Sequence, residues 1–330
     1  MGECLRAVVL DNRRPANRRP LFYDRINPSD FSAYRSVENL GAFKKMLAFE
    51  MPDLAIVSGG DGTLGAVINS VRTIYEEPPV LYYRGGGSAN TWLKDLVKQP
   101  KVDIPSHLQG IFREGEFEGR HIHALVRESE EKVEYGAYLV GAGHPTVPVT
   151  RTKEWLYDQG FRNTHLMYLM AGAASALTLL SRTQPTELLI KDGDATEVMD
   201  TERIAGAAVF TTNGIGTFVF QKQLLVPRDK VRLFTISADS EPGLIYKYNA
   251  ALLVGLRNPD RAVEKGLIDV YDVDGVRVFP GQPENPNQPN CCIDGELVRE
   301  DGPMMLYRDN QQITVILHIP LIERYRMQTG

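Results

Sequence analysis

The sequence has few cysteines and no long apolar segment. Its 330 residues include three cysteines, Cys4, Cys291 and Cys292. An odd number with two adjacent fits neither a disulfide framework nor a zinc site. The longest nearly apolar stretch, M-Y-L-M-A-G-A-A-S-A-L-T-L-L, has about 14 residues, fewer than the roughly 20 of a membrane-spanning helix. The apolar run near the N-terminus is also too short for a signal peptide. We therefore expect a cytoplasmic protein with reduced thiols and at most peripheral membrane contact.

The sequence also lacks an excess of positive charge. Lys and Arg together number 37 and Asp and Glu 42, which gives a formal net charge of −5. Proteins that bind nucleic acids usually carry a strongly basic surface, so we expect no nucleic-acid partner. Hydrophobic residues make up 43% of the chain and charged residues 24%, which is the balance of a soluble globular protein.

Strand-like and helix-like segments alternate over the first hundred residues. The expected strands are 5–10, 54–57 and 80–83, and the expected helices are 36–50, 63–75 and a segment that begins near residue 88. Ser36 and Ser88 are the expected N-caps of the first and third helices. Such alternation predicts a parallel sheet that is covered on both faces by helices. Ligands of such sheets bind at the carboxyl ends of the strands.

The pattern changes after about residue 105. Many short β-type runs follow, separated by turn residues, and helical patterns interrupt them only near 164–181 and 241–255. The sequence therefore predicts two parts. The first is a three-layer α/β domain with a parallel sheet, and the second is larger, β-rich, mostly antiparallel and sandwich-like.

The stretch S-G-G-D-G-T-L-G, residues 58–65, lies between an expected strand and an expected helix. Glycine lets a ligand approach the main chain, and the start of a helix offers backbone N–H groups to an anion. The stretch is not a Walker A loop, because it has no lysine. An ordinary turn in which Asp61 caps a helix explains it about as well. A second glycine loop, R-G-G-G-S-A-N at 84–90, follows one strand later and is harder to explain as a turn alone.

Three motifs together resemble a known family. G-G-D-G-T at 59–63, G-S-A-N at 87–90 and D-G-E at 294–296 resemble the motifs of diacylglycerol kinase catalytic domains and bacterial lipid kinases. NAD kinases and sphingosine kinases share that fold. The resemblance spans most of the chain and implies an α/β nucleotide-binding domain formed by 1–105 with a returning segment at about 308–330. Residues 106–307 would then form the β-rich domain that binds the acceptor.

The resemblance also implies roles for individual residues. It implies a kinase that holds ATP between its two domains and uses Mg²⁺. The residues implied to contact the nucleotide are Asn12, Gly59, Gly60, Asp61, Gly62, Thr63, Gly87, Ser88 and Asn90. Glu296 is the expected base that deprotonates the acceptor hydroxyl, and Asp61 and Asp294 are expected to position magnesium or the acceptor. Asp229 is the expected metal ligand.

Departures from the family pattern leave alternatives open. The first strand is followed by D-N-R-R-P in place of a small-residue motif, and the stretch around Asp229 keeps only one residue of the family's metal-supporting segment. The sequence therefore leaves the acceptor open between a lipid and another small molecule. An NAD kinase-like enzyme and a nucleotide-binding regulator without kinase activity remain alternatives. A homodimer is compatible with the sequence.

Overall fold

A computed structural model of the chain describes residues 5–11, 26, 28–86, 91–112, 115–143, 146–161, 163–177, 185, 187–212, 214–215, 218–219, 226–227, 229–255, 258–282, 288–320 and 323. The chain divides into two compact units. Unit 1 comprises Met1–His123 and Asn310–Gly330, and unit 2 comprises Ala124–Asp309. The strand that follows residue 116 joins the sheet of unit 1 and so belongs to that unit.

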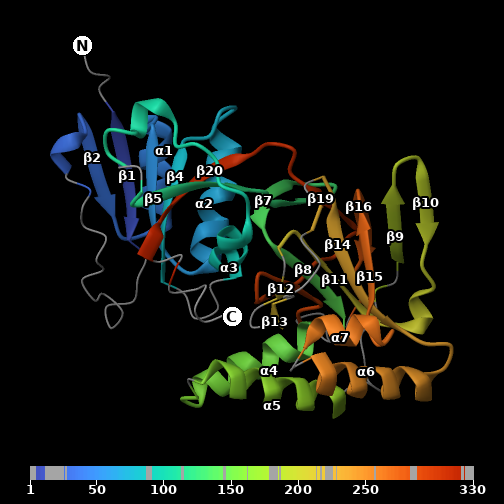
Figure 1. Ribbon diagram of the computed structural model, residues 1–330. Coiled ribbons are helices and arrows are strands. Elements are labelled where there is room, and N and C mark those ends of the chain that lie inside the picture. Colours follow the sequence, from blue (N-terminus) through green and yellow to red (C-terminus); the bar gives the residue numbers. More distant parts are fainter. Residues whose placement is uncertain are drawn as a thin grey trace. The chain divides into compact units, whose positions relative to one another are not determined.

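Unit 1 is built on a six-stranded sheet, counted over its described residues, with the order β2-β1-β3-β4-β20-β5 (Figure 1). The strands are β1 (Arg6–Asp11), β2 (Ala33–Val37), β3 (Leu54–Gly59), β4 (Val80–Gly86), β5 (Phe117–Ile122) and β20 (Ile313–His318). All neighbouring pairs are parallel except β5 and β20, which are antiparallel. The expected parallel sheet is therefore confirmed.

Helices connect the parallel strands of unit 1. They are α1 (Leu40–Glu50), α2 (Asp61–Ile74) and α3 (Thr91–Lys98), with short 3₁₀ turns at Pro28–Asp30 and Ser106–Leu108. The prediction that Ser36 caps the first helix is wrong. Ser36 pairs with Val9 in the sheet, and α1 begins only after Asn39, whose side chain accepts a hydrogen bond of 2.8 Å from the backbone N–H of Ala42. Pairing of β2 with β1 overrides the helical pattern of the sequence there.

One face of this sheet carries a continuous apolar row. Val9 pairs with Ile56, Ile56 with Tyr82, and Tyr82 with Ile316, and all four side chains belong to one buried cluster. Because successive side chains of a strand point to opposite faces, the residues two positions further along each strand lie on this same face.

Unit 2 is a sandwich of two sheets, each with six strands among the described residues. Sheet B has the order β10-β9-β16-β19-β6-β7, and sheet C has the order β15-β14-β11-β8-β17-β18. The strands are β6 (Leu125–Glu128), β7 (Val133–Ala137), β8 (Leu139–Gly143), β9 (Glu187–Asp192), β10 (Ala195–Val198), β11 (Ile204–Phe210), β14 (Val231–Ser237), β15 (Asp269–Val273), β16 (Gly275–Phe279), β17 (Cys291–Ile293), β18 (Glu296–Val298) and β19 (Met304–Arg308). All pairs are antiparallel, which confirms the expected β-rich part.

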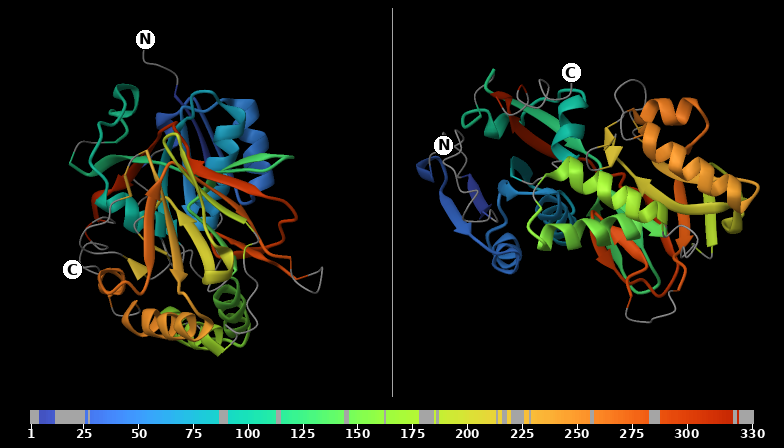
Figure 2. Two further views of the ribbon diagram at one scale, coloured as in Figure 1. Left: turned by 90° about the vertical axis from the view of Figure 1, so that its right-hand side faces the viewer. Right: turned by 90° about the horizontal axis from the view of Figure 1, so that it is seen from below.

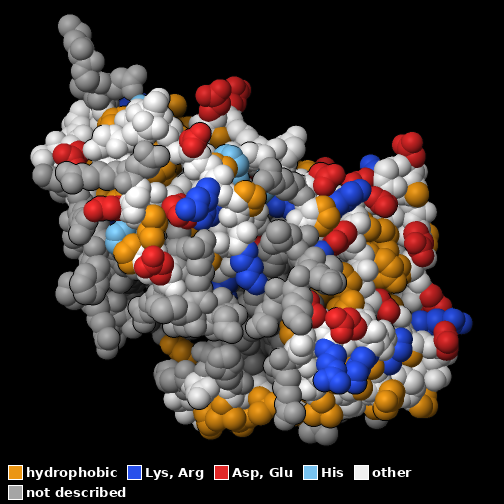
Figure 3. Space-filling model, in the orientation of Figure 1, with side chains coloured by type: hydrophobic (Ala, Val, Ile, Leu, Met, Phe, Trp, Pro, Cys, Tyr) orange, Lys and Arg blue, Asp and Glu red, His pale blue; other side chains and the backbone are white. Residues whose placement is uncertain are grey.

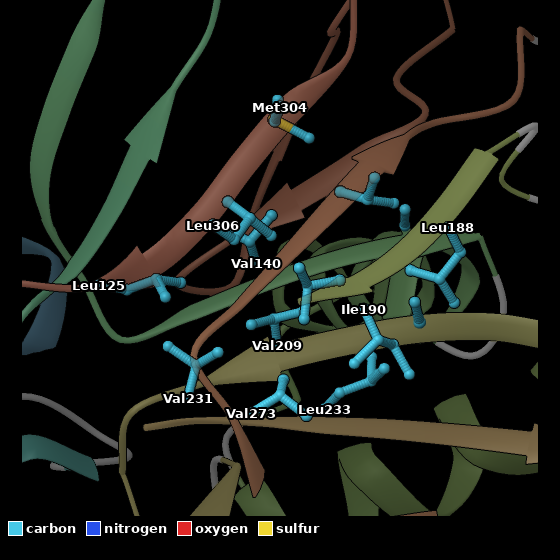
Figure 4. Close-up of a cluster of buried hydrophobic side chains, with 14 of the residues drawn as sticks. Leu125, Val140, Leu188, Ile190, Val209, Val231, Leu233, Val273, Met304 and Leu306 are labelled. Atoms are coloured by element: carbon cyan, nitrogen blue, oxygen red, sulfur yellow. The ribbon is translucent and has the colours of Figure 1, made fainter. Parts of the chain in front are cut away.

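The core of unit 2 lies between the two sheets. Leu188, Ile190 and Leu306 of sheet B pack with Val140 and Leu233 of sheet C in one buried cluster (Figure 4). The described part of unit 2 also contains a separate short hairpin of β12 (Gly214–Ile215) and β13 (Phe218–Val219). A 3₁₀ turn lies at Thr201–Arg203.

Four helices cover the other face of sheet C and lie together in every view (Figures 1 and 2). They are α4 (Thr146–Asp158), α5 (Thr164–Leu177), α6 (Glu241–Gly255) and α7 (Pro259–Glu264). The sequence predicts α5 and α6 but not α4, whose first turn is rich in β-branched residues and proline. Tertiary packing stabilises it: Thr146 lies against Gly141, and the Thr150 hydroxyl lies 3.2 Å from the Cys292 sulfur. None of the helices in the described residues is long and apolar enough to cross a membrane.

Candidate functional site

The glycine-rich stretch forms the predicted strand–turn–helix junction in unit 1. β3 ends at Gly59, Gly60 is the N-cap of α2, and the N–H of Leu64 closes the first turn on the Gly60 carbonyl at 3.1 Å. A Cβ atom on Gly59 would lie 2.6 Å from Cβ and Oγ1 of Thr63. Only glycine therefore fits here. The first N–H groups of a helix have no intrahelical partner, so the start of α2 suits an anion.

Asp61 joins this turn to the next helix of unit 1. One of its carboxylate oxygens accepts the N–H of Thr91 at 2.7 Å and the other accepts the N–H of Trp92 at 3.2 Å. Asp61 therefore caps α3 and not its own helix. The side chain is only 8% exposed, and burial raises the pKa of its carboxyl, against the opposing effects of the two N–H groups and the Lys94 ammonium. Asp61 therefore does cap a helix, as the alternative reading of the turn had it, and it ties the start of α2 to the start of α3.

The remaining predicted nucleotide contacts fall into two groups. Gly62 is exposed and Thr63 is half-buried, so the first turn of α2 is open to a ligand. Asn12, Gly87, Ser88 and Asn90 lie outside the described residues. Their roles stay predictions.

The sequence reasoning did not single out two buried polar residues beside this turn. Ser58 is the residue before Gly59, and Arg84 lies near the end of β4; both are buried. The available signal was a polar residue at the carboxyl end of an otherwise apolar strand, in L-A-I-V-S and V-L-Y-Y-R. Charged side chains are almost never buried in this way unless they are paired or functional.

In unit 2, the D-G-E motif forms the hairpin turn between β17 and β18. Asp294 and Gly295 are its two central residues, with φ angles of +53° and +87°. Both are left-handed, as a two-residue type I′ turn requires. One Asp294 carboxylate oxygen accepts the N–H groups of Tyr138 and Leu139 at 2.8 and 3.0 Å, and so fixes the hairpin to the start of β8. Asp294 therefore stabilises the turn and its attachment to β8.

Glu296 is placed differently from Asp294. It is the first residue of β18 and is exposed, so its carboxylate is accessible to a reactant. The helix α4 lies beside it, where the Lys153 ammonium is 3.5 Å from the Gly295 carbonyl oxygen. Burial, and then the negative charges of Asp158 and Glu296, raise the pKa of Glu154. Sequence reasoning missed Lys153 and Glu154, because no motif marks α4.

The predicted metal ligand, Asp229, is exposed. The next residue, Lys230, places its ammonium 2.6 Å from Asp192 and 2.6 Å from Asp274. This ammonium supplies the positive charge that a metal ion would bring to those carboxylates. Within the part of the chain that the structure describes, no group of three or more His, Cys, Asp or Glu side chains could hold a metal ion. The carboxylates next to Asp229 therefore do not fit a protein-bound Mg²⁺.

No protein-family model matches the sequence, and no curated protein matches it significantly. Two solved structures from Bacillus anthracis str. Sterne do match the fold. Both proteins are assigned as diacylglycerol kinases, the first of them provisionally. The first has a TM-score of 0.57 at 13% identity and covers 94% of this chain and 94% of that chain. The second has a TM-score of 0.55 at 12% identity and covers 94% and 96%. The chain has the fold of these kinases.

The kinase-type fold expected from the three motifs is thereby confirmed. A third solved structure is an NAD kinase from Archaeoglobus fulgidus in complex with ATP, with a TM-score of 0.47 at 10% identity over 98% of both chains. Identities this low establish the fold alone, because one fold can host many functions.

Proposed function

We propose that this protein is a kinase that transfers a phosphoryl group from ATP to a hydroxyl group of a lipid or lipid-like acceptor. The observation that carries the proposal is the junction of β3 and α2. Gly59 is packed so closely against Thr63 that no side chain fits, and the start of α2 presents backbone N–H groups at the carboxyl end of a parallel sheet. This arrangement suits the phosphates of a nucleotide.

In this proposal the glycine turn holds the nucleotide phosphates through the backbone of Gly60, Gly62 and Thr63. Asp61 fixes the start of α3, the helix that follows the second glycine loop in the chain. Such positioning and charge stabilisation account for most of the catalysis of phosphoryl transfer. ATP supplies the phosphoryl group.

Glu296 is the proposed general base. Its carboxylate is exposed, it is held by a rigid hairpin, and an ammonium group on α4 lies beside that hairpin. A base must reach the hydroxyl proton in the reacting geometry and must be ionised at the working pH. Asp294, which already accepts two backbone N–H groups, is better suited to orient the hairpin than to exchange a proton.

Two observations support a lipid acceptor. The matching bacterial structures are assigned as diacylglycerol kinases. In addition, the helices of unit 2 expose apolar side chains that gather along the lower edge in Figure 3. The most exposed large apolar side chains of these helices are those of Trp155, Leu166, Leu169, Tyr246 and Leu253. Tryptophan and tyrosine favour membrane–water interfaces. We propose peripheral contact with a lipid surface at this face during turnover.

The test is to incubate the protein with labelled ATP, magnesium and a total lipid extract, and to separate the products. We expect label in a lipid. Label found only in NADP after addition of NAD would instead favour an NAD kinase-like enzyme. Tight ATP binding without transfer to any acceptor would favour a nucleotide-binding regulator.

Two variants connect the activity to the proposed residues. Glu296→Gln and Asp61→Ala should each abolish labelling of the lipid. Glu197→Gln, which changes another exposed glutamate of unit 2, is the matched control and should leave labelling unchanged. Full activity in Glu296→Gln would remove this residue from the proposed mechanism.

A further inference from the structure

A row of polar side chains crosses the carboxyl edge of the unit 1 sheet. On the face that carries the apolar row, the next residues outward are Asp11 of β1, Ser58 of β3, Arg84 of β4 and His318 of β20. Asp11 pairs directly with Ser58. The four strands are neighbours in the order β1-β3-β4-β20, so the row runs unbroken across them.

Contacts with the aromatic cluster confirm which face these side chains occupy. The Arg84 guanidinium carbon lies 5.7 Å from the centre of the Tyr82 ring, and the His318 ring lies 5.0 Å from the Phe117 ring. Tyr82 and Phe117 themselves pack edge to face at 5.8 Å. Ser58 is 0% exposed, His318 6% and Arg84 8%. A guanidinium and an imidazole are therefore held on one aromatic platform.

A local irregularity of β4 lies at the same place. The register between β3 and β4 shifts between Val57 and Gly59, where three steps of β4 correspond to two steps of β3. Gly85 has a φ angle of +67° at this point. This is a β-bulge, a feature that re-aims side chains and is frequent beside functional sites. It places Arg84 at the end of the regular ladder.

Ser58 provides an independent sign of a ligand. Its hydroxyl is completely buried and has no hydrogen-bond partner among the residues that the structure describes. Buried polar groups in folded proteins nearly always have a partner, so an exception calls for an explanation. A bound group that accepts a hydrogen bond at this point supplies one.

We propose that Ser58, Arg84 and His318 form a binding site for the phosphate end of a nucleoside phosphate. Arg84 provides the positive charge that the lysine-free glycine turn lacks, and guanidinium groups match phosphate geometry. Asp11 lies two strands away from Arg84, about 10 Å at the spacing of neighbouring strands. It is therefore placed to accept a sugar hydroxyl rather than to repel the phosphate. The nucleoside part rests on the proposed function; the anion site does not.

The experiment measures binding of ADP, adenosine and inorganic pyrophosphate by titration calorimetry. In Arg84→Gln we expect ADP affinity to fall by about tenfold or more while adenosine affinity is unchanged, because a charge-assisted contact to phosphate is lost. Arg84→Lys, which keeps the charge but not the fork of donors, should lose less. Arg35→Gln, at an exposed arginine of the same unit, is the matched control.

Ser58→Ala separates a ligand role from a structural one. Removing a buried hydroxyl without a partner should raise the melting temperature of the ligand-free protein and weaken ADP binding at the same time. A purely structural serine would lower the melting temperature and leave ADP affinity as it is. This variant also keeps the test valid if Arg84→Gln does not fold.

The outcomes distinguish the two proposals. Wild-type binding of ADP that is unaffected in Arg84→Gln and Ser58→Ala would overturn this inference and leave the kinase proposal standing. Binding of pyrophosphate that depends on Arg84, in a protein that binds neither ADP nor ATP, would support the anion site and overturn the kinase proposal. If the wild type binds neither ADP nor pyrophosphate, the anion site is overturned.

Discussion

Asp61 accepts a 2.7 Å hydrogen bond from the backbone N–H of Thr91, which lies 30 residues later in the chain. One residue of the first glycine loop thereby caps the helix that follows the second. The bond ties the start of α2 to the start of α3. Because Asp61 serves the fold in this way, loss of activity on its replacement has to be separated from loss of structure.

Replacement of Asp61 by alanine and by asparagine makes that separation. Alanine leaves the buried N–H groups of Thr91 and Trp92 without an acceptor, whereas asparagine keeps one acceptor oxygen. We expect Asp61→Ala to have a free energy of unfolding about 1–2 kcal/mol lower than Asp61→Asn. Urea denaturation measures the difference. Equal stabilities would show that the cap contributes nothing.

The pH dependence of stability should carry the signature of Asp61. Burial raises the pKa of its carboxyl in the folded state above the ordinary 3.8, so the folded state holds this proton more tightly than the unfolded chain does. The contribution of Asp61 to the free energy of unfolding therefore falls as the pH rises from 3.8 through the folded-state pKa. Urea denaturation between about pH 4 and 7 should show Asp61→Asn gaining stability relative to wild type as the pH rises. A constant difference would contradict the raised pKa.

Gly59→Ala should destabilise unit 1, because the new methyl group would lie 2.6 Å from Thr63. The expected loss is about 1–3 kcal/mol in the free energy of unfolding, as for other overpacked sites. Gly110→Ala is the control, since a methyl group there meets nothing within 4 Å. Adding Thr63→Gly to Gly59→Ala should recover part of the loss. If the double variant is no better than the single one, the clash with Thr63 is not the cause.

The two acids of the D-G-E hairpin should differ in their roles: replacing Asp294 should lower stability, and replacing Glu296 should lower activity with little effect on stability. Asp294→Ala removes the acceptor for Tyr138 and Leu139 and disfavours the positive φ angle, so we expect a loss of about 1–3 kcal/mol. Asp294→Asn, which tolerates that conformation and keeps the oxygen, should be milder. Glu296→Gln is an exposed change and should alter stability by less than about 0.5 kcal/mol. Thermal unfolding alongside the kinase assay decides whether the two acids differ as stated.

The adjacent cysteines should be unreactive in the native protein. Cys291 and Cys292 are buried, and burial raises the pKa of the Cys291 thiol to about 12. The thiolate is the reactive form, so alkylation near pH 8 should label neither residue until the protein is denatured. Peptide mapping by mass spectrometry reads this out. Rapid labelling of either cysteine in the folded protein would contradict its burial.

Local patterns predicted the parts of unit 1 that local chemistry controls. The apolar runs that form β3 and β4 are buried on both faces, and a continuous short apolar run predicts such a strand. The glycine turn at 59–60 and the helix after it follow from residues that are close in sequence. Where long-range pairing competes with a local preference, the pattern failed. Ser36 looks like a helix cap but pairs in the sheet with Val9.

The same contrast holds for unit 2. Asp-Gly predicts a tight turn by itself, and the turn is there with two positive φ angles. Asp294 also accepts a hydrogen bond from the backbone of Tyr138, 156 residues earlier in the chain. No local sequence pattern predicts this contact. The helix α4 was missed because its stability comes from packing against β8 and β17 rather than from its own residues.

The sequence by itself determined the α/β and β-rich halves and the glycine turn before α2, because these depend on periodicity and on residues that need particular backbone angles. The kinase-type fold was expected from the resemblance of three motifs to a known family. Only the tertiary structure decided that Asp61 caps α3, that Asp294 holds its hairpin, and that Ser58, Arg84 and His318 share one face of a sheet. Those relationships join segments that are distant in the chain. Sheet order and register bring them together, and the residues concerned carry no local signal of either.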